Sequence, residues 1–143
     1  MKILVINGHP DKESYCQAIF QTIVETIDSN RHELQVISLN EEDFDPVLRY
    51  GYRKRMEEDS FILRSQEWIQ WADHLIFVYP IWWSSMPSLM KGWIDRVFTP
   101  GIAYSANDQG SFIWNYLRGK QFKKLLKGKT ASIYATSMAP TWW

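Results

Sequence analysis

Two adjacent tryptophans and several small polar residues give residues 80–87 the chemistry of a ligand site. The segment begins with Pro80, Ile81, Trp82, Trp83 and Ser84. It directly follows an apolar run at residues 74–79, which is typical of a buried strand. An indole face can stack on a flat heterocycle while loop N–H groups meet its polar edge. The alternative, which is commoner for tandem aromatics, is that both indoles belong to a core or an interface.

The loop at residues 8–14 is a second candidate site. It follows an apolar strand predicted at residues 2–7 and opens a helix at Ser14, which has capping-box spacing to Gln17. Free N–H groups and the dipole at a helix start favour a bound phosphate, and His9, Lys12 and the Ser14 hydroxyl are candidates for further donors. The glycine patterns of P-loop and dinucleotide-binding enzymes are absent, which disfavours both classes. The alternative is an ordinary strand-to-helix turn with Ser14 as its cap.

The elements that position these loops alternate between strand and helix. Strands are predicted at residues 2–7, 34–39, 74–79 and 130–135, and helices from Ser14, at 59–72 and from Pro87. This alternation predicts an α/β fold with a parallel sheet and helices on both faces. Ligands bind such sheets at the carboxyl ends of the strands, which adds residues 136–140 as a third candidate loop.

Two finer expectations concern strand order and the connections. The uniformly apolar residues 3–6 place the first strand in the centre, which gives the order 2-1-3-4. Residues 98–119 are expected to form a long loop, and residues 122–126 a short helical turn.

Composition sets limits on function. The 143 residues favour a single domain over residues 1–143, with 45% hydrophobic and 22% charged residues. Sixteen basic residues balance sixteen acidic ones, so bulk charge supports neither a nucleic-acid partner nor a polybasic membrane surface. Eight Trp, seven Tyr and seven Phe exceed what one small core needs. We therefore expect a flat-ligand pocket and a homodimer, with residues 98–114 in the interface.

Other residue types point to location and exclude further chemistry. The single cysteine, Cys16, cannot form an internal disulfide and favours the cytoplasm. The apolar run at residues 3–6 is too short for export or for membrane insertion. His32 and His74 have no second ligand at metal spacing, so no metal is expected.

Several motifs occur in the order found in one known family. They are Gly8-His9-Pro10, Ser14-Tyr15, Phe44-Asp45-Pro46-Val47-Leu48, Trp71-Ala72-Asp73-His74, Pro80-Ile81-Trp82-Trp83, Met86-Pro87, the stretch from Leu89 to Phe98, and Gly101-x-Ala103-Tyr104. Over nearly the full chain the sequence resembles the flavodoxin-like NAD(P)H:quinone oxidoreductases, which include drug-activity modulators and potassium-efflux ancillary proteins. The resemblance implies a flavodoxin-like doubly wound sheet. Family members continue through a further helix and strand, so the final strand is expected to be missing here.

The same resemblance implies a flavoenzyme that passes two electrons from NAD(P)H to quinones or similar acceptors. The cofactor would be FMN, with FAD as the alternative, and the flavin rather than a protein residue would carry the chemistry. By analogy His9, Ser14, Tyr15 and Cys16 surround the flavin phosphate, and residues 80–84 surround the ring. The third loop carries Thr136, Ser137, Met138 and Ala139 where many members have Thr-Thr-Gly-Gly, and its N–H groups are the candidates for stabilising negative charge on the flavin. Tyr104 matches the aromatic residue that borders the substrate pocket, which in the family is commonly completed by the partner subunit.

Two alternative functions remain open at this point. One is a regulatory subunit that docks onto a membrane transporter and uses flavin occupancy as a redox signal. The other is a non-catalytic remnant that folds and dimerises without holding flavin firmly.

Overall fold

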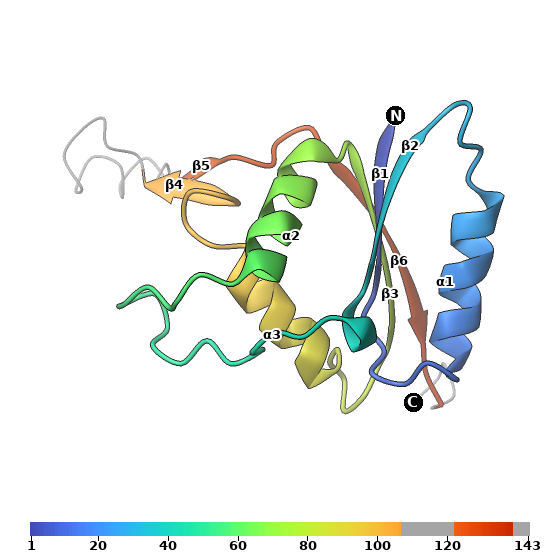
Figure 1. Cartoon of the computed structure of the whole chain (residues 1–143), viewed down its shortest axis with the longest axis horizontal. Coiled ribbons are helices and arrows are strands. Elements are labelled where there is room, and N and C mark those ends of the chain that lie inside the picture. Colours follow the sequence, from blue (N-terminus) through green and yellow to red (C-terminus); the bar gives the residue numbers. More distant parts are fainter. Residues whose placement is uncertain (107–121, 139–143) are drawn as a thin grey trace.

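A computed structural model describes residues 1–106 and 122–138 (Figure 1). Its helices are α1 (Tyr15–Thr26), the short 3-10 helix η1 (Leu39–Glu41), α2 (Ser60–Trp71) and α3 (Ser88–Val97). Its strands are β1 (Lys2–Asn7), β2 (Glu33–Ser38), β3 (His74–Pro80), β4 (Tyr104–Ala106), β5 (Phe122–Lys124) and β6 (Thr130–Thr136). None of the helices in these ranges is long and apolar enough to cross a membrane.

Four of the described strands form a parallel sheet in the order β2-β1-β3-β6. This confirms the predicted order, because β6 is the fourth predicted strand of the sheet. Residues 3–7 of β1 are all buried, as expected of a central strand covered on both faces. β6 lies at one edge and leaves Ile133 61% and Tyr134 47% exposed.

Alternating residues of β1 point to two separate cores. Ile3 and Val5 pack with Cys16 and Phe20 of α1 on one face. Leu4 and Ile6 contribute to the larger core on the opposite face, which α2 and α3 cover (Figure 1). The helices therefore cover both faces of the sheet, as the sequence predicted, and the carboxyl ends of its strands meet at one edge.

Side-chain caps fix where two of the helices begin. Ser14 Oγ accepts a hydrogen bond from the Gln17 N–H at the start of α1. Asp59 Oδ1 accepts from the N–H groups of Phe61 and Ile62 at the start of α2. Both helix starts agree with the sequence prediction.

Glycines allow α3 to contact its neighbours very closely on two sides. A Cβ at Gly8 would lie 2.3 Å from Met90 Sδ, and one at Gly92 would lie 2.2 Å from the Pro46 carbonyl oxygen. Pro46 belongs to an irregular segment, residues 42–59, that crosses the outer side of α2 and α3 and that we call the strap (Figure 1).

The helical turn predicted at residues 122–126 is wrong. Residues 122–124 instead form β5, which pairs antiparallel with β4. The pairing partner of β5 lies about twenty residues earlier in the chain, and such a non-local preference is not visible in the local apolar pattern. The β4–β5 pair lies beyond α2 and α3 on the side away from the sheet (Figure 1).

Candidate functional site at the carboxyl edge of the sheet

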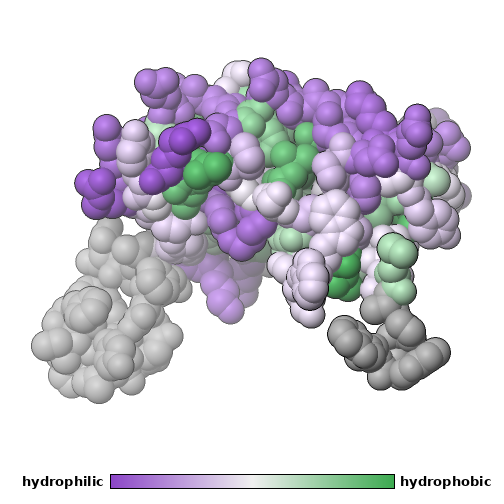
Figure 2. Space-filling view, turned by 90° about the horizontal axis from the view of Figure 1, so that it is seen from below, coloured by the Kyte–Doolittle hydropathy of each residue, from purple (hydrophilic) through white to green (hydrophobic). Residues whose placement is uncertain are grey.

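Two hydrogen bonds join the three predicted loops to neighbouring strands at one edge. The Gly8 N–H donates to the Val78 carbonyl at 2.8 Å, and the Ile81 N–H donates to the Thr136 carbonyl at 2.7 Å. The loops after β1, β3 and β6 therefore start side by side, as the parallel topology requires. Figure 2 views the molecule from this edge.

The first loop is held by its own polar groups. Asn7 is fully buried at the end of β1, and its Oδ1 accepts from the His9 N–H at 3.0 Å. His9 Nδ1 in turn accepts from the Asp11 N–H at 2.9 Å. In the neutral ring the proton therefore resides on Nε2, which remains a donor.

The first turn of α1 exposes donors beside this loop. The Ser14 hydroxyl accepts from the Gln17 N–H at 3.2 Å and so keeps its own proton for another acceptor. The Tyr15 and Cys16 N–H groups donate no hydrogen bond to any described residue, because the first N–H groups of a helix lack partners. Predicted site residues His9, Ser14, Tyr15 and Cys16 thus come together around one helix start.

Cys16 and Tyr15 differ in what their side chains do. Cys16 is 1% exposed, and its Sγ lies 3.2 Å from Thr136 Oγ1. This contact joins the first turn of α1 to the end of β6, so Cys16 contributes its backbone to the predicted site while its thiol packs inside. The Tyr15 side chain is 75% exposed at the same helix start.

The second loop reverses direction through a strained two-residue turn. Trp82 and Ser85 exchange backbone hydrogen bonds of 2.8 and 3.0 Å. Between them Trp83 and Ser84 have φ of 51° and 59°, a left-handed conformation that costs an L-residue about 1–2 kcal/mol. Their N–H groups donate no hydrogen bond within residues 1–106 and 122–138. Strain of this kind is concentrated at functional sites.

The side chains of the second loop are largely exposed. Trp83 is completely exposed, and Trp82 and Ile81 are 46% and 42% exposed. Pro80, the last residue of β3, is buried and contributes to the packing below the loop. The His9 ring meets Trp82 edge-on with centroids 5.4 Å apart, which connects the first loop to the second. Apolar and weakly polar side chains gather on this face below a hydrophilic rim (Figure 2).

The third loop is described only in part. Thr136 is half-buried at the end of β6, Ser137 follows it, and the Met138 side chain is completely exposed. Ala139 lies outside the described residues.

Tyr104 does not join the other predicted site residues within one chain. It lies on β4, beyond α2 and α3 and far from the loops at the carboxyl edge of the sheet (Figure 1). A pocket bordered by Tyr104 and by the second loop would therefore need Tyr104 from a second copy.

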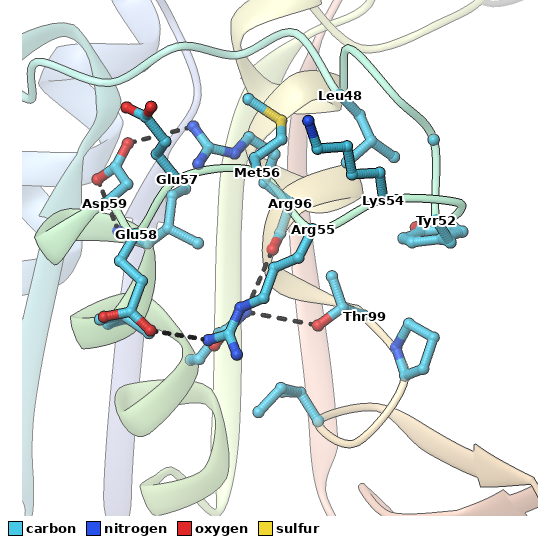
Figure 3. A pocket seen from close by; sticks show the side chains of 16 residues that line it. Leu48, Tyr52, Lys54, Arg55, Met56, Glu57, Glu58, Asp59, Arg96 and Thr99 are labelled. Atoms are coloured by element: carbon cyan, nitrogen blue, oxygen red, sulfur yellow. Dashed lines mark hydrogen bonds and ion pairs between the residues drawn. The ribbon is translucent and has the colours of Figure 1, made fainter.

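A cavity of about 440 Å³ lies elsewhere, between the strap and the outer side of α2 and α3 (Figure 3). At its inner side Arg96 is 7% exposed, and its Nη1 donates to the Asp45 carbonyl at 2.6 Å and to Asp59 Oδ2 at 3.1 Å. Gln66 Nε2 donates to the Arg96 carbonyl and to Thr99 Oγ1. In the part of the chain that is described, no three His, Cys, Asp or Glu side chains are placed to hold a metal ion.

Sequence reasoning did not identify Asn7 and Gln17 as parts of the site. Asn7 Nδ2 donates to Gln17 Oε1 at 2.6 Å. The available signal was a polar residue at the end of an apolar strand, since a buried amide needs hydrogen-bond partners. The reciprocal half of the capping box is not formed, because Gln17 bonds to Asn7 instead.

Several known proteins are similar to this chain. A ribosyldihydronicotinamide dehydrogenase-like protein of Penicillium crustosum is 30% identical over 95% of this chain and 57% of its own length. The ribosyldihydronicotinamide dehydrogenase [quinone] of Mus musculus is 28% identical over 93% of this chain and 66% of its own. The chain thus spans about three fifths of the length of these curated relatives.

Solved structures agree with the sequence comparison. A Streptococcus mutans crystal structure superposes with a TM-score of 0.79 at 34% identity, covering 99% of this chain and 71% of the other. The model of the flavodoxin-like fold family Flavodoxin_2 matches residues 1–142. With the sheet order and the three loops described above, this match shows that the chain belongs to the flavodoxin-like fold family.

Proposed function

We propose that this protein is a flavin-dependent reductase that passes two electrons, as hydride, from NAD(P)H to quinones or similar small acceptors. FMN is the proposed cofactor, with FAD as the alternative. One observation carries the proposal. Two pairs of N–H groups without a partner in the described chain, at Tyr15 and Cys16 and at Trp83 and Ser84, occur at the sheet edge where this fold binds ligands. The two curated relatives are named as a ribosyldihydronicotinamide dehydrogenase-like protein and, in Mus musculus, as a ribosyldihydronicotinamide dehydrogenase [quinone], which supports the same class of reaction.

The first loop fits the phosphate of a flavin nucleotide. The α1 start combines two N–H donors, the Ser14 hydroxyl proton and the His9 Nε2 donor. Anions bind at helix starts because N–H groups and the helix dipole both favour negative charge. No acidic side chain is contributed by the first turn of α1.

The second loop fits the flat ring. The exposed indoles of Trp82 and Trp83 supply apolar area, and the Trp83 and Ser84 N–H groups supply donors for a polar ring edge. The N–H groups of the third loop, residues 136–139, are proposed to stabilise negative charge on the ring.

A bound flavin would accept hydride from the nicotinamide and pass it to the acceptor, so no protein nucleophile is required. The residues of this chain bind and orient: the loops hold the phosphate and one ring edge and leave a flat face open. The loop residues would leave that face accessible to the donor and then to the acceptor, so that each could lie flat and close enough to react.

A homodimer is part of the proposal. The position of Tyr104, far from the loops of its own chain, supports a site completed by a second copy (Figure 1). A cytoplasmic location, suggested by the single cysteine, also belongs to the proposal.

Flavin titration by fluorescence quenching tests the function. We expect Trp83→Ala to weaken FMN binding about ten- to a hundredfold, because losing one aromatic contact typically costs about 1–3 kcal/mol. Trp68→Ala is the control, since Trp68 packs against the core on α2 and should leave affinity within twofold. Absence of flavin binding by the wild type would overturn the proposal and favour the remnant.

A second comparison tests the phosphate position. We expect Ser14→Ala to weaken FMN binding more than riboflavin binding, because only FMN carries the phosphate that Ser14 would hold. Equal losses for both ligands would move the phosphate away from α1.

A further inference from the structure

Asn7 is a buried polar side chain whose amide connects three parts of the candidate site. It is the last residue of β1 and has no exposed surface. Its Oδ1 accepts from the His9 N–H at 3.0 Å, and its Nδ2 donates to Gln17 Oε1 at 2.6 Å. One amide therefore joins the strand end, the first loop and the first turn of α1.

Each of these bonds fixes a donor that the proposed phosphate site uses. The bond to the His9 N–H sets the direction of the loop and with it the imidazole ring, whose edge meets Trp82. Gln17 is the third residue of α1, so its bond to Asn7 holds the turn that carries the Tyr15 and Cys16 N–H groups.

We infer that Asn7 is a positioning residue for the phosphate end of the flavin site, acting through His9 and Gln17 without touching the ligand. The inference rests on the proposed flavin-binding function. It goes beyond that function in assigning selectivity for a phosphorylated flavin over riboflavin to a residue beneath the loop. Preorganised donors bind an anion more tightly because less ordering is needed on binding.

The test measures FMN and riboflavin affinities of the wild type, Asn7→Leu, Gln17→Leu and the double variant. Leucine approximates the size of asparagine and removes both hydrogen bonds. We expect Asn7→Leu to weaken FMN binding about tenfold and to leave riboflavin affinity within twofold. Loss of a well-placed hydrogen bond to a charged phosphate typically lowers affinity by about that factor. The double variant should lose no more FMN affinity than Asn7→Leu alone, since the two side chains act as one unit.

Ser65→Ala is the matched control. Ser65, on α2 and away from the three loops, is also a fully buried polar residue. Its Oγ accepts a hydrogen bond from Trp93 Nε1 at 3.1 Å. It should lower stability while leaving the ratio of FMN to riboflavin affinity unchanged. An equal loss of both ligands in Asn7→Leu, or no loss, would overturn the inference and leave the proposed function standing. If Asn7→Leu does not fold, Gln17→Leu carries the same comparison, because Gln17 is only half-buried.

A measurement without flavin separates the positioning role of Asn7 from the proposed flavin-binding function. Inorganic phosphate is titrated against the flavin-free protein while the amide signals of Tyr15 and Cys16 are followed by NMR. If the wild type binds neither flavin, the proposed function fails. Phosphate-induced shifts present in the wild type and lost in Asn7→Leu would then still support the positioning role, and their absence from the wild type would overturn it.

Discussion

The loops at the carboxyl edge of the sheet and the strap over α2 and α3 are both hollowed or exposed, yet they differ in their polar groups. Several charged side chains of the strap form ion pairs: Asp59 with Arg96 of α3, Asp45 with Arg49, and Glu58 with Arg55. In the loops, backbone donors at Tyr15, Cys16, Trp83 and Ser84 have no partner among the described residues. The cavity under the strap shows room for a ligand, whereas the loops show groups that a ligand would satisfy.

The two regions also differ in how they are stabilised. Arg96 supports the strap from below by bonding Asp45 and the capping residue of α2, Asp59. The second loop contains backbone strain at Trp83 and Ser84 and exposes its indoles. The buried Arg96 thus stabilises the strap through hydrogen bonds, whereas the second loop combines strain with exposed groups of the kind found at functional sites.

Arg96→Leu should give the largest effect on this contrast. The buried Arg96 pairs with the partly exposed Asp59, and removing one partner of a fully buried pair typically costs about 3–5 kcal/mol, so the lower end of that range applies here. Urea denaturation of Arg96→Leu should therefore show a loss of about 3 kcal/mol in the free energy of unfolding. Arg55→Leu is the control, because the exposed Arg55–Glu58 pair is worth less than about 1 kcal/mol. Equal losses of unfolding free energy in both variants would mean that the contacts of Arg96 do not stabilise the strap.

Ser84→Gly tests the strain in the second loop and should have an intermediate effect of opposite sign. Glycine adopts positive φ without the penalty of about 1–2 kcal/mol, although its greater freedom in the unfolded chain offsets part of the gain. We expect thermal or urea denaturation to show a gain of about 0.5–1 kcal/mol. Ser85→Gly, one residue outside the strained pair, should give no gain. A lower free energy of unfolding in Ser84→Gly than in the wild type would contradict the backbone strain.

Tyr52→Phe should have the smallest effect. The Tyr52 hydroxyl donates to the Asp95 carbonyl at 3.2 Å at an exposed position, so at neutral pH the loss should stay below about 1 kcal/mol. Partial loss of water around the phenol and the nearby Asp95 carboxylate raise the pKa of Tyr52 above its usual 10.0. Because the neutral phenol is favoured in the folded state, its contribution is complete below pH 10 and is lost as pH rises through the raised pKa. Between pH 8 and 11.5 the free energy of unfolding should fall less steeply with pH for Tyr52→Phe than for the wild type. Parallel curves for the two proteins would contradict this.

The sequence was sufficient for the sheet and for the placement of the loops. The apolar residues 3–6 indicated a central strand, and the caps at Ser14 and Asp59 marked two helix starts, because these signals are local. Strand order then brought the loops after β1, β3 and β6 to one edge.

The interactions that shape the site were not predictable in the same way. The Cys16–Thr136 contact spans 120 residues, and the Arg96–Asp59 pair spans 37. Such pairs depend on tertiary packing, which local patterns do not encode. The left-handed turn at Trp83 was also hidden, since neither Trp83 nor Ser84 is a residue type that signals positive φ.

The tight seating of α3 has a consequence for how sequence variation can act on this protein. Met90 faces Gly8 of the first loop, and Gly92, two positions later, faces Pro46 of the strap. Both regions therefore share a single helical support, and neither glycine position has room for a methyl group without a shift of its neighbour. In a library randomised at positions 8 and 92, glycine should dominate the surviving clones at both. Diversity would be tolerated in the strap's exposed residues far more readily than at the two points where α3 is held.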